Sequence, residues 1–392
     1  MMDDELDVLQ RLTAVPELLA SIPVERVHEM KLQAELRKKF DPELVRTALT
    51  LVELRNRAKA KFTRAAELWL DRASLEQATA ESIARHKAKR FSDSETPVLD
   101  LFSGMGSNAI GLALEGRNVI AVETTELQAT RVRMNAAAYG VSDRIQASVE
   151  ENPLALAGES LLHLQPRREL GKQRAVKLED HQPALDELKA LIDVTPGGAF
   201  TLSSASNFGG KFDGCEAELI SLNGDCLEAV IWYGSLRKEH AMTATILPAG
   251  WTMSGNPWEA YAQVGPLGTY LYDPDSAVVR AGLLNQLAES LQLDRLDGAE
   301  EYLSGNELIS SPAVTPYEVI ADLPNNDRDI RNYFRQSEIG ELEIRCRHVP
   351  VDAAALRRKL PLSGREKAVL FYAKLDGKTR ALIARRVDQQ PS

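Results

Sequence analysis

The chain of 392 residues has only three cysteines, Cys215, Cys226 and Cys346. Their spacing fits no metal-ligand pattern, and three thiols are too few for the disulfide framework of a small secreted domain. We therefore expect three small buried side chains in a protein of the reducing cytoplasm, and we expect no metal.

Long apolar runs are also missing, since no stretch approaches the ~20 residues that a membrane helix needs. The N-terminal segment MMDDELDVLQRL is acidic and has no signal-peptide pattern. We expect no membrane partner. The net charge of −10 argues against a surface coated with nucleic-acid contacts, although a local basic patch remains compatible with it.

The first 91 residues contain no glycine. Apolar residues recur there at helical spacing, for example Leu6, Leu9 and Leu12, and the pattern predicts a helical domain over residues 1–91. A basic run at residues 55–64 has two interpretations: a solvated helix face, or a contact to RNA phosphates.

The central feature is the stretch 97–123, PVLDLFSGMGSNAIGLALEGRNVIAVE. Its pattern predicts a buried strand, a glycine turn, a helix and a second buried strand that ends at Glu123. A strand that leads into a glycine turn and a helix N-terminus forms a site for a nucleotide-like ligand, and an acid after the next strand can bind a ribose.

The glycine turn lacks the third glycine of the G-x-G-x-x-G pattern, and a glycine pair by itself also fits close packing alone. The longer segment DLFSGMGSNAIGLAL, however, resembles motif I of the class I S-adenosylmethionine-dependent methyltransferases. The resemblance implies that Glu123 binds the ribose hydroxyls of S-adenosyl-L-methionine. It implies further cofactor-binding residues in the turn, namely Asp100, Phe102, Ser103, Gly104, Gly106 and Asn108.

A third strand, RIQASV at 144–149, is followed by Glu150 and Glu151. The resemblance implies that Glu151 receives the adenine amino group, with Glu150 one position away. A plain loop acid is the equal alternative.

A fourth strand at 161–164 leads into Gln165, Pro166, Arg167 and Arg168. Class I methyltransferases carry motif IV here, and a related bacterial group has the pattern Asp-Pro-x-Arg-Arg. The resemblance therefore implies that Gln165 and Pro166 are the catalytic residues. Glutamine can accept a hydrogen bond but cannot act as a general base, so this departure bears on catalysis.

Two further departures from the bacterial group are Thr201 and Ser204, which replace the lysine and proline of a Lys-Leu-Ser-Pro-like stretch. Strands at 216–222 and 227–233 flank Asn-Gly-Asp, which is a strong hairpin signal. This pair is expected to close the sheet of a methyltransferase domain at 92–236. Residues 237–312 resemble the small ferredoxin-like domain of the same group, and Trp251 and Trp258 are expected in its core.

Residues 313–392 resemble the THUMP-like domain of this group, a kind of RNA-binding module. The segment 331–392 carries 14 Lys or Arg against 7 Asp or Glu, a local charge of +7 in an acidic chain. This asymmetry favours an RNA partner, with a solvated basic face as the alternative. The expected phosphate contacts are Arg345, Arg347, Arg357, Arg358 and Lys359.

The expected fold is therefore α/β: a class I methyltransferase Rossmann-like sheet, an N-terminal helical domain and small C-terminal α+β domains. The expected function is methyl transfer from S-adenosylmethionine to a base of RNA. The alternative is a catalytically degenerate module that binds RNA or protein. A nicotinamide-dependent oxidoreductase is a third interpretation, which the missing glycine disfavours.

Overall fold

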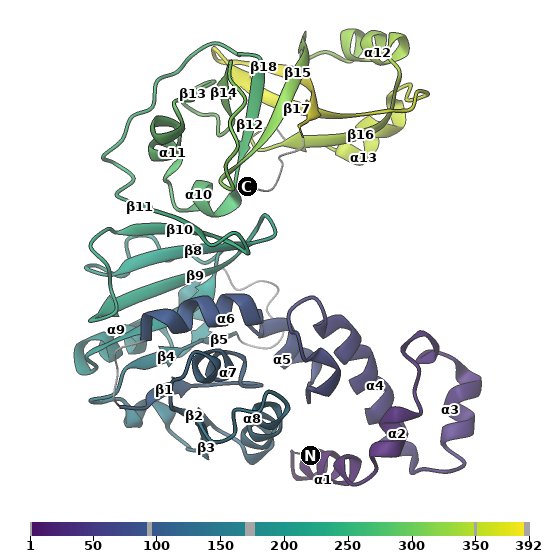
Figure 1. Cartoon of the computed structure of the whole chain (residues 1–392), viewed down its shortest axis with the longest axis vertical. Coiled ribbons are helices and arrows are strands. Elements are labelled where there is room, and N and C mark those ends of the chain that lie inside the picture. The colour runs from purple at the N-terminus through teal and green to yellow at the C-terminus, as the bar shows by residue number, and fades with distance from the viewer. Residues whose placement is uncertain (1, 92–95, 169–176, 349–350, 388–392) are drawn as a thin grey trace. The chain divides into compact units, whose positions relative to one another are not determined.

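The computed structural model describes residues 2–91, 96–168, 177–348 and 351–387 (Figure 1). Contacts divide the chain into two units. The first contains residues 1–215 and 230–238, and the second contains residues 216–229 and 239–392. Strand β9 (Asp225–Gly234) contributes residues to both.

The first unit opens with helices, as predicted from the glycine-free segment. The longest, α4, begins after Asp41, whose side chain accepts hydrogen bonds from the backbone N–H groups of Glu43 and Leu44. Leu12, Leu18 and Val45 are fully buried among these helices. The six helices are α1 (Met2–Thr13), α2 (Pro16–Ala20), α3 (Met30–Leu36), α4 (Pro42–Ala58), α5 (Arg72–Gln77) and α6 (Glu81–Ala88).

The sheet of the first unit has the strand order β9-β7-β4-β1-β2-β3. The strands β3, β2, β1, β4 and β7 are mutually parallel, so their carboxyl ends meet at one edge, where doubly wound folds bind ligands. The strands are β1 (Val98–Leu101), β2 (Val119–Glu123), β3 (Ile145–Val149), β4 (Leu162–Leu164) and β7 (Gly197–Ser203). The helices after them are α7 (Ser107–Leu114), α8 (Glu126–Ala138) and α9 (Leu185–Val194), and β5 (Arg167–Arg168) pairs with β6 (His181–Gln182).

Helix α6 packs directly on α7, as Figure 1 shows. A Cβ atom placed on Gly111 of α7 would lie 2.6 Å from the Cβ of Ala84 in α6. The two backbones can approach this closely only because position 111 has no side chain.

In the second unit, three strands follow the order β11-β10-β8 and continue into the first half of β9. They are β8 (Glu216–Leu222), β10 (Met242–Leu247) and β11 (Trp251–Gly255). Glu218 of β8 is buried, and it accepts a hydrogen bond of 2.6 Å from the hydroxyl of Thr245 in β10.

The second sheet of this unit has seven strands in the order β13-β14-β12-β15-β18-β17-β16. Their bounds are β12 (Tyr270–Pro274), β13 (Asp294–Arg295), β14 (Leu303–Gly305), β15 (Val314–Pro324), β16 (Ile339–Cys346), β17 (Glu366–Leu375) and β18 (Lys378–Arg386). Because β12 pairs with β15, strands of the expected ferredoxin-like and THUMP-like segments share one sheet, and residue 312 does not separate two sheets.

Alternating residues of β17 supply both faces of this sheet. Leu370 and Tyr372 belong to one apolar cluster, which includes Ile330 and Phe334 of α12, while Val369 and Phe371 belong to another. The helices of this unit are α10 (Ser276–Arg280), α11 (Leu284–Leu291), α12 (Asp327–Gln336) and α13 (Ala353–Lys359).

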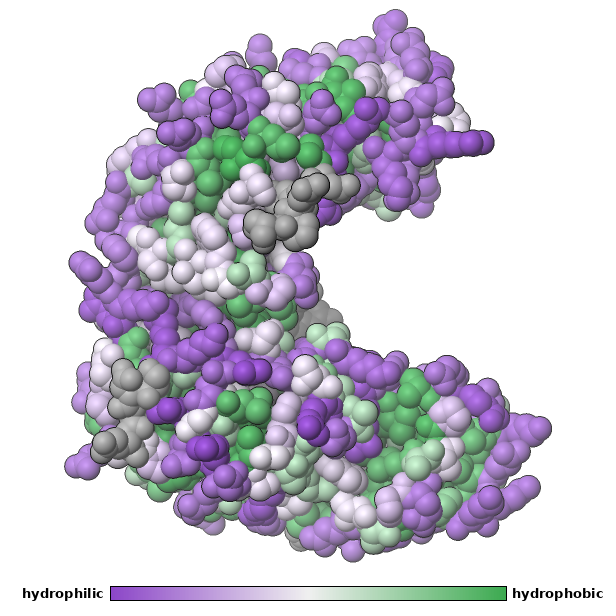
Figure 2. Space-filling view, in the orientation of Figure 1, coloured by the Kyte–Doolittle hydropathy of each residue, from purple (hydrophilic) through white to green (hydrophobic). Residues whose placement is uncertain are grey.

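Some surface features differ from expectation. Trp258 is 84% exposed, so its prediction as a core residue was wrong. The three cysteines are free and only partly buried. Figure 2 shows hydrophobic side chains gathered over α2 to α4, whereas the surface over α12 is hydrophilic. Within the described ranges, no helix combines the length and apolar character that crossing a membrane requires.

Candidate cofactor site

The turn between β1 and α7 has three residues in the left-handed region: Phe102 at φ +58°, Gly104 at +63° and Gly106 at +88°. Glycine suits this conformation because it has no Cβ. A Cβ on Gly106 would also lie 3.3 Å from a methyl group of Val132 in α8. The turn is closed by a hydrogen bond of 2.9 Å from the Gly106 N–H to the Ser103 carbonyl.

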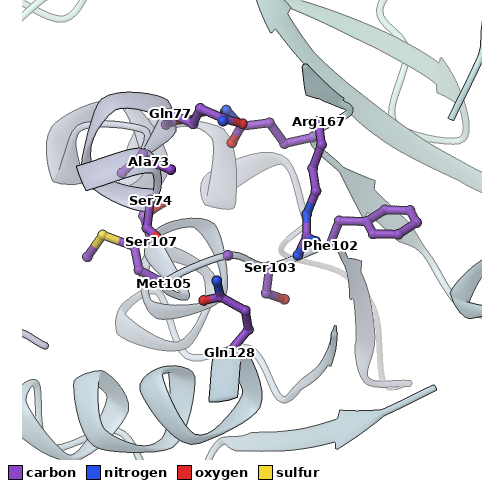
Figure 3. A pocket seen from close by; sticks show the side chains of 12 residues that line it. Ala73, Ser74, Gln77, Phe102, Ser103, Met105, Ser107, Gln128 and Arg167 are labelled. Atoms are coloured by element: carbon purple, nitrogen blue, oxygen red, sulfur yellow. Dashed lines mark hydrogen bonds between the residues drawn. The ribbon is translucent and has the colours of Figure 1, made fainter. Parts of the chain in front are cut away.

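A pocket of about 200 Å³ lies over this turn, at the carboxyl edge of the parallel sheet (Figure 3). Its walls come from α5, the β1–α7 turn, α8 and the segment after β4. The lining residues are Ala73, Ser74, Gln77, Ala78, Phe102, Ser103, Gly104, Met105, Ser107, Gln128, Gln165 and Arg167. The sequence predicted the turn and Gln165 but missed Ser74, Gln77, Gln128 and Arg167.

Glu123 ends β2, and its side chain is fully buried. Its carboxylate accepts hydrogen bonds from the N–H groups of Gly104 and Thr124 and forms an ion pair with Arg167. The Arg167 side chain is 36% exposed, and its guanidinium carbon lies 5.5 Å from the centre of the Phe102 ring. The sequence thus predicted the acid Glu123 next to the glycine turn, and the structure shows that Arg167 forms an ion pair with this acid.

Asp100 lies beneath the turn rather than in the pocket wall. It is 1% exposed, accepts a hydrogen bond of 2.7 Å from the Ser103 hydroxyl, and lies 2.6 Å from Nδ1 of His163. His163 Nε2 is 3.0 Å from the hydroxyl of Thr201, to which the ammonium of Lys87 donates at 2.8 Å. With a neutral imidazole, this buried chain donates hydrogens in one direction, from Lys87 to Asp100.

This buried chain of hydrogen bonds includes Thr201, one of the positions at which the sequence departs from the bacterial pattern. Thr201 replaces a lysine of the sheet, and Lys87 of α6 brings an ammonium to the Thr201 hydroxyl. Lys87 is 2% exposed, which is rare for a lysine and requires the polar neighbours that it has here.

The side-chain amide of Gln165 has a defined orientation. Its Nε2 donates to the Gln77 carbonyl at 2.8 Å, and its Oε1 accepts from Asn108 Nδ2 at 3.0 Å. Asn108 is 5% exposed, and its own Oδ1 has no hydrogen-bond partner among the described residues. The side-chain oxygen of Gln165, which the sequence identified as a hydrogen-bond acceptor, thus already accepts from Asn108, and Pro166 is buried beside it.

The remaining predicted residues fall into two groups. Gly106 and Asn108 support the turn from behind, outside the pocket wall. Glu151 is exposed in the loop after β3, next to Glu150, whose N–H donates to the Glu123 carbonyl at 2.9 Å. The structure thus brings the β1–α7 turn, Glu123 and Gln165 together, with Glu151 in a neighbouring loop.

Two of the five expected RNA contacts are held inside the second unit. Arg345 pairs with Asp273 and Glu343, and its guanidinium lies 5.6 Å from the centre of the Tyr317 ring. Arg347 pairs with Asp273 at 2.7 Å and with Glu301 at 2.8 Å. Burial by itself would lower the pKa of Arg345, but hydrogen bonds and charges from its acidic neighbours raise that pKa.

The other three, Arg357, Arg358 and Lys359, are exposed on the last turn of α13. The helix begins at Asp352, whose carboxylate accepts a hydrogen bond of 2.9 Å from the Ala355 N–H. Cations at a helix C-terminus are favourable, and these three side chains extend into solvent. In the described part of the chain, no three His, Cys, Asp or Glu side chains are grouped so that they could hold a metal.

The chain matches three family models. Residues 95–156, which contain the glycine turn and Glu123, match the model of the RNA cap guanine-N2 methyltransferases. Residues 314–386 match a THUMP domain-like model, and residues 7–58 match a domain of unknown function.

Two relatives are the uncharacterized S-adenosylmethionine-dependent methyltransferases MT3122 and Rv3037c of Mycobacterium tuberculosis (strains CDC 1551 / Oshkosh and ATCC 25618 / H37Rv). Each is 31% identical over 339 residues, which cover 82% of this chain and 90% of the relative. The chain therefore belongs to the S-adenosylmethionine-dependent methyltransferases, and S-adenosylmethionine is its cofactor.

The fold is found in a solved structure as well. A crystal structure described as a “putative methyltransferase” from Porphyromonas gingivalis W83 superposes with a TM-score of 0.77 at 18% identity. The match covers 97% of this chain and 98% of the other. The expected α/β fold with a methyltransferase sheet, helical N-terminus and C-terminal sheet domain is thus confirmed.

Proposed function

We propose that this protein transfers the methyl group of S-adenosylmethionine to a base of RNA. The observation that carries the proposal is the buried carboxylate of Glu123 beside the left-handed turn Phe102–Gly106, at the carboxyl edge of the sheet. A buried carboxylate there suits two ribose hydroxyls, which donate to it. The RNA part of the proposal is supported by the family models for residues 95–156 and 314–386.

The residues around the pocket offer the hydrogen-bonding groups that the parts of the cofactor require. Backbone groups of Phe102, Ser103 and Gly104 would hold its methionine part, and Glu123 its ribose. Glu151, in the exposed loop after β3, would receive the adenine amino group. Asp100, Gly106 and Asn108 would act by keeping the turn in shape, through Ser103, Val132 and Gln165 respectively.

When bound, the cofactor supplies an electrophilic methyl group. The chain then has to orient the accepting atom of the base and exclude water, since in-line displacement depends mainly on positioning. Gln165 and Pro166, directly after β4, are the residues we propose for this task. The exposed cations of α13 would hold RNA phosphates, and Arg345 and Arg347 would contribute chiefly by stabilising the sheet that carries α13.

One observation favours a second candidate function, a degenerate module that binds cofactor and RNA or a protein without turnover. Gln165 cannot take up a proton as a carboxylate would, and its Oε1 already accepts from Asn108. The module would bind S-adenosylhomocysteine as the enzyme does.

Tritiated S-adenosylmethionine distinguishes the two functions. We expect the wild-type protein to label total bacterial RNA, and a Glu123→Gln variant to label it far less. Wild-type binding of S-adenosylhomocysteine by calorimetry without labelling of any RNA would refute methyl transfer to RNA. A gain of labelling in Gln165→Asp over an inactive wild type would identify the degenerate module.

A further inference from the structure

Arg167 occupies the carboxylate that the cofactor needs. Glu123 is fully buried, and its carboxylate accepts from Gly104, Thr124 and Arg167. A carboxylate offers about four lone-pair sites, so three donors leave about one of them open. If Glu123 binds the ribose, as the proposed function holds, two hydroxyls must displace at least one donor that is now there. Gly104 and Thr124 donate through the backbone, so Arg167 is the donor that can leave.

The size of the pocket supports this conclusion. Its volume of about 200 Å³ is below the ~300–1,000 Å³ of most small-molecule sites. Arg167 forms part of its wall and pairs with Glu123, and Figure 3 shows its side chain reaching toward the turn, with the Phe102 side chain pointing away from it. Movement of this one side chain would free the carboxylate and enlarge the pocket beside it.

The position of Arg167 indicates what it binds afterwards. It follows Gln165 and Pro166 at the end of β4, where the base would enter, and its side chain is already 36% exposed. A guanidinium binds phosphate oxygens through paired hydrogen bonds. Two other cations of this unit are held elsewhere: Lys87 is buried on Thr201, and Arg90 lies over Trp232 at 4.5 Å.

We propose that Arg167 binds a backbone phosphate of the RNA substrate, and that it becomes available when the cofactor's ribose takes its place on Glu123. This inference rests on the proposed function. Cofactor and RNA then bind with positive coupling, because each removes a competitor of the other, and such coupling is reciprocal.

The first test is calorimetry without RNA, comparing the wild type with Arg167→Met, which removes the donors but keeps an unbranched side chain of similar length. The probes are S-adenosylhomocysteine, 5′-methylthioadenosine and adenine. We expect the variant to bind the two ribose-containing probes about 10- to 100-fold more tightly, since a charge-assisted hydrogen bond no longer has to be broken. Adenine, without ribose, should bind both proteins equally.

The second test measures a fluorescein-labelled single-stranded RNA of mixed sequence by anisotropy over a salt series. Each phosphate contact contributes about 0.7 to the slope of log K against log salt for single strands. We expect saturating S-adenosylhomocysteine to steepen the wild-type slope by about 0.7 and to leave the Arg167→Met slope unchanged. Arg167→Lys, which keeps the charge, should retain the steeper slope.

Matched controls separate this proposal from the function on which it rests. Arg133→Gln removes another arginine of the same unit, paired with Glu126 at 2.6 Å outside the pocket, and should behave as the wild type. Weaker binding of S-adenosylhomocysteine by Arg167→Met, with methylthioadenosine unchanged, would assign Arg167 to the cofactor carboxylate and overturn the proposal. Identical slope changes in both proteins would overturn it too. A wild type that binds no S-adenosylhomocysteine would instead refute the proposed function.

Discussion

Two buried carboxylates, one in each unit, form ion pairs with arginines in different surroundings. Glu123 in the first unit pairs with one arginine, which is partly exposed at the rim of a pocket. Asp273 in the second unit, 9% exposed, pairs with both Arg345 and Arg347, and each guanidinium also lies over a tyrosine ring. The chemistry of the pairs is the same, but the surroundings differ.

The difference teaches what makes an ion pair exchangeable. The arginines on Asp273 have further carboxylate partners, Glu343 and Glu301, so leaving would break several contacts at once. Arg167 has solvent on one side and an open pocket on the other. We therefore interpret the Asp273 cluster as part of the scaffold and the Glu123 pair as part of the site.

The largest expected effect is on stability, from Asp273→Ala. Two half-buried arginines would lose a shared counter-ion, and breaking a buried pair costs about 3–5 kcal/mol. We expect the free energy of unfolding of the second unit, measured by urea titration of the full chain, to fall by this amount. Asp322→Ala, which removes the exposed pair with Arg380, should cost less than about 1 kcal/mol. Equal losses in the two variants would contradict the distinction.

Glu123→Gln should act on ligand binding instead. The neutral amide accepts hydrogen bonds less strongly than a carboxylate, and a bond to a charged group contributes about 1.5–3 kcal/mol. We expect the affinity for S-adenosylhomocysteine to fall about 10- to 100-fold in calorimetry. Glu126→Gln, on the exposed start of α8, is the control and should leave this affinity unchanged. A large loss of stability without a loss of affinity would show that Glu123, like Asp273, serves the scaffold and does not bind the cofactor.

A third prediction compares the arginines of the second unit with one another. Replacing Arg357, Arg358 and Lys359 together by glutamine should weaken RNA binding and reduce the salt slope by about 2, because three phosphate contacts are lost. Arg345→Gln should lower stability but leave the slope unchanged, since its guanidinium is held by Asp273 and Glu343. The reverse pattern, measured by anisotropy with labelled RNA, would show that the ion-paired arginine is the phosphate contact.

The smallest effect concerns Glu81, a carboxylate that accepts hydrogen bonds from neutral donors. Burial would raise its pKa, but hydrogen bonds from the Thr63 N–H and hydroxyl and from the Tyr139 hydroxyl lower it below its ordinary value. A lowered folded-state pKa stabilises the protein above the unfolded pKa, and this contribution is lost as pH falls through the folded pKa. We expect the difference in unfolding free energy between wild type and Glu81→Gln to shrink progressively as the pH falls below the unfolded-state pKa of about 4.3. A difference that stays constant over this acid range would exclude the ionised carboxylate as its source.

Much of the fold could be predicted because local patterns determine it. The helical spacing predicted around Leu6, Leu9 and Leu12 is α1, and the hairpin signal at Asn223 and Gly224 joins β8 to β9. The glycine turn and the acid at the end of β2 were equally visible, since their geometry depends on a few adjacent residues.

The rest depends on contacts between residues far apart in the sequence. Asp273 precedes Arg345 by 72 positions, so the sequence counted that arginine as free charge. The pairing of Lys87 with Thr201 spans 114 positions and gives no local signal. Arg167 was visible as a basic residue after Gln165 and Pro166, but its direction toward Glu123 follows from the fold alone.

The close contact of α6 and α7 at Gly111 has a consequence for the tolerance of the site to change. Residues 73–78, which form one wall of the pocket, lead directly into α6, and the turn that forms its floor leads into α7. The spacing of these two helices is therefore set by the hydrogen atom that stands where residue 111 would otherwise carry a methyl group. Gly111 does not line the pocket, yet one added carbon at this position would push the two helices apart and alter the width of the pocket. The geometry of the site therefore depends on a residue outside it.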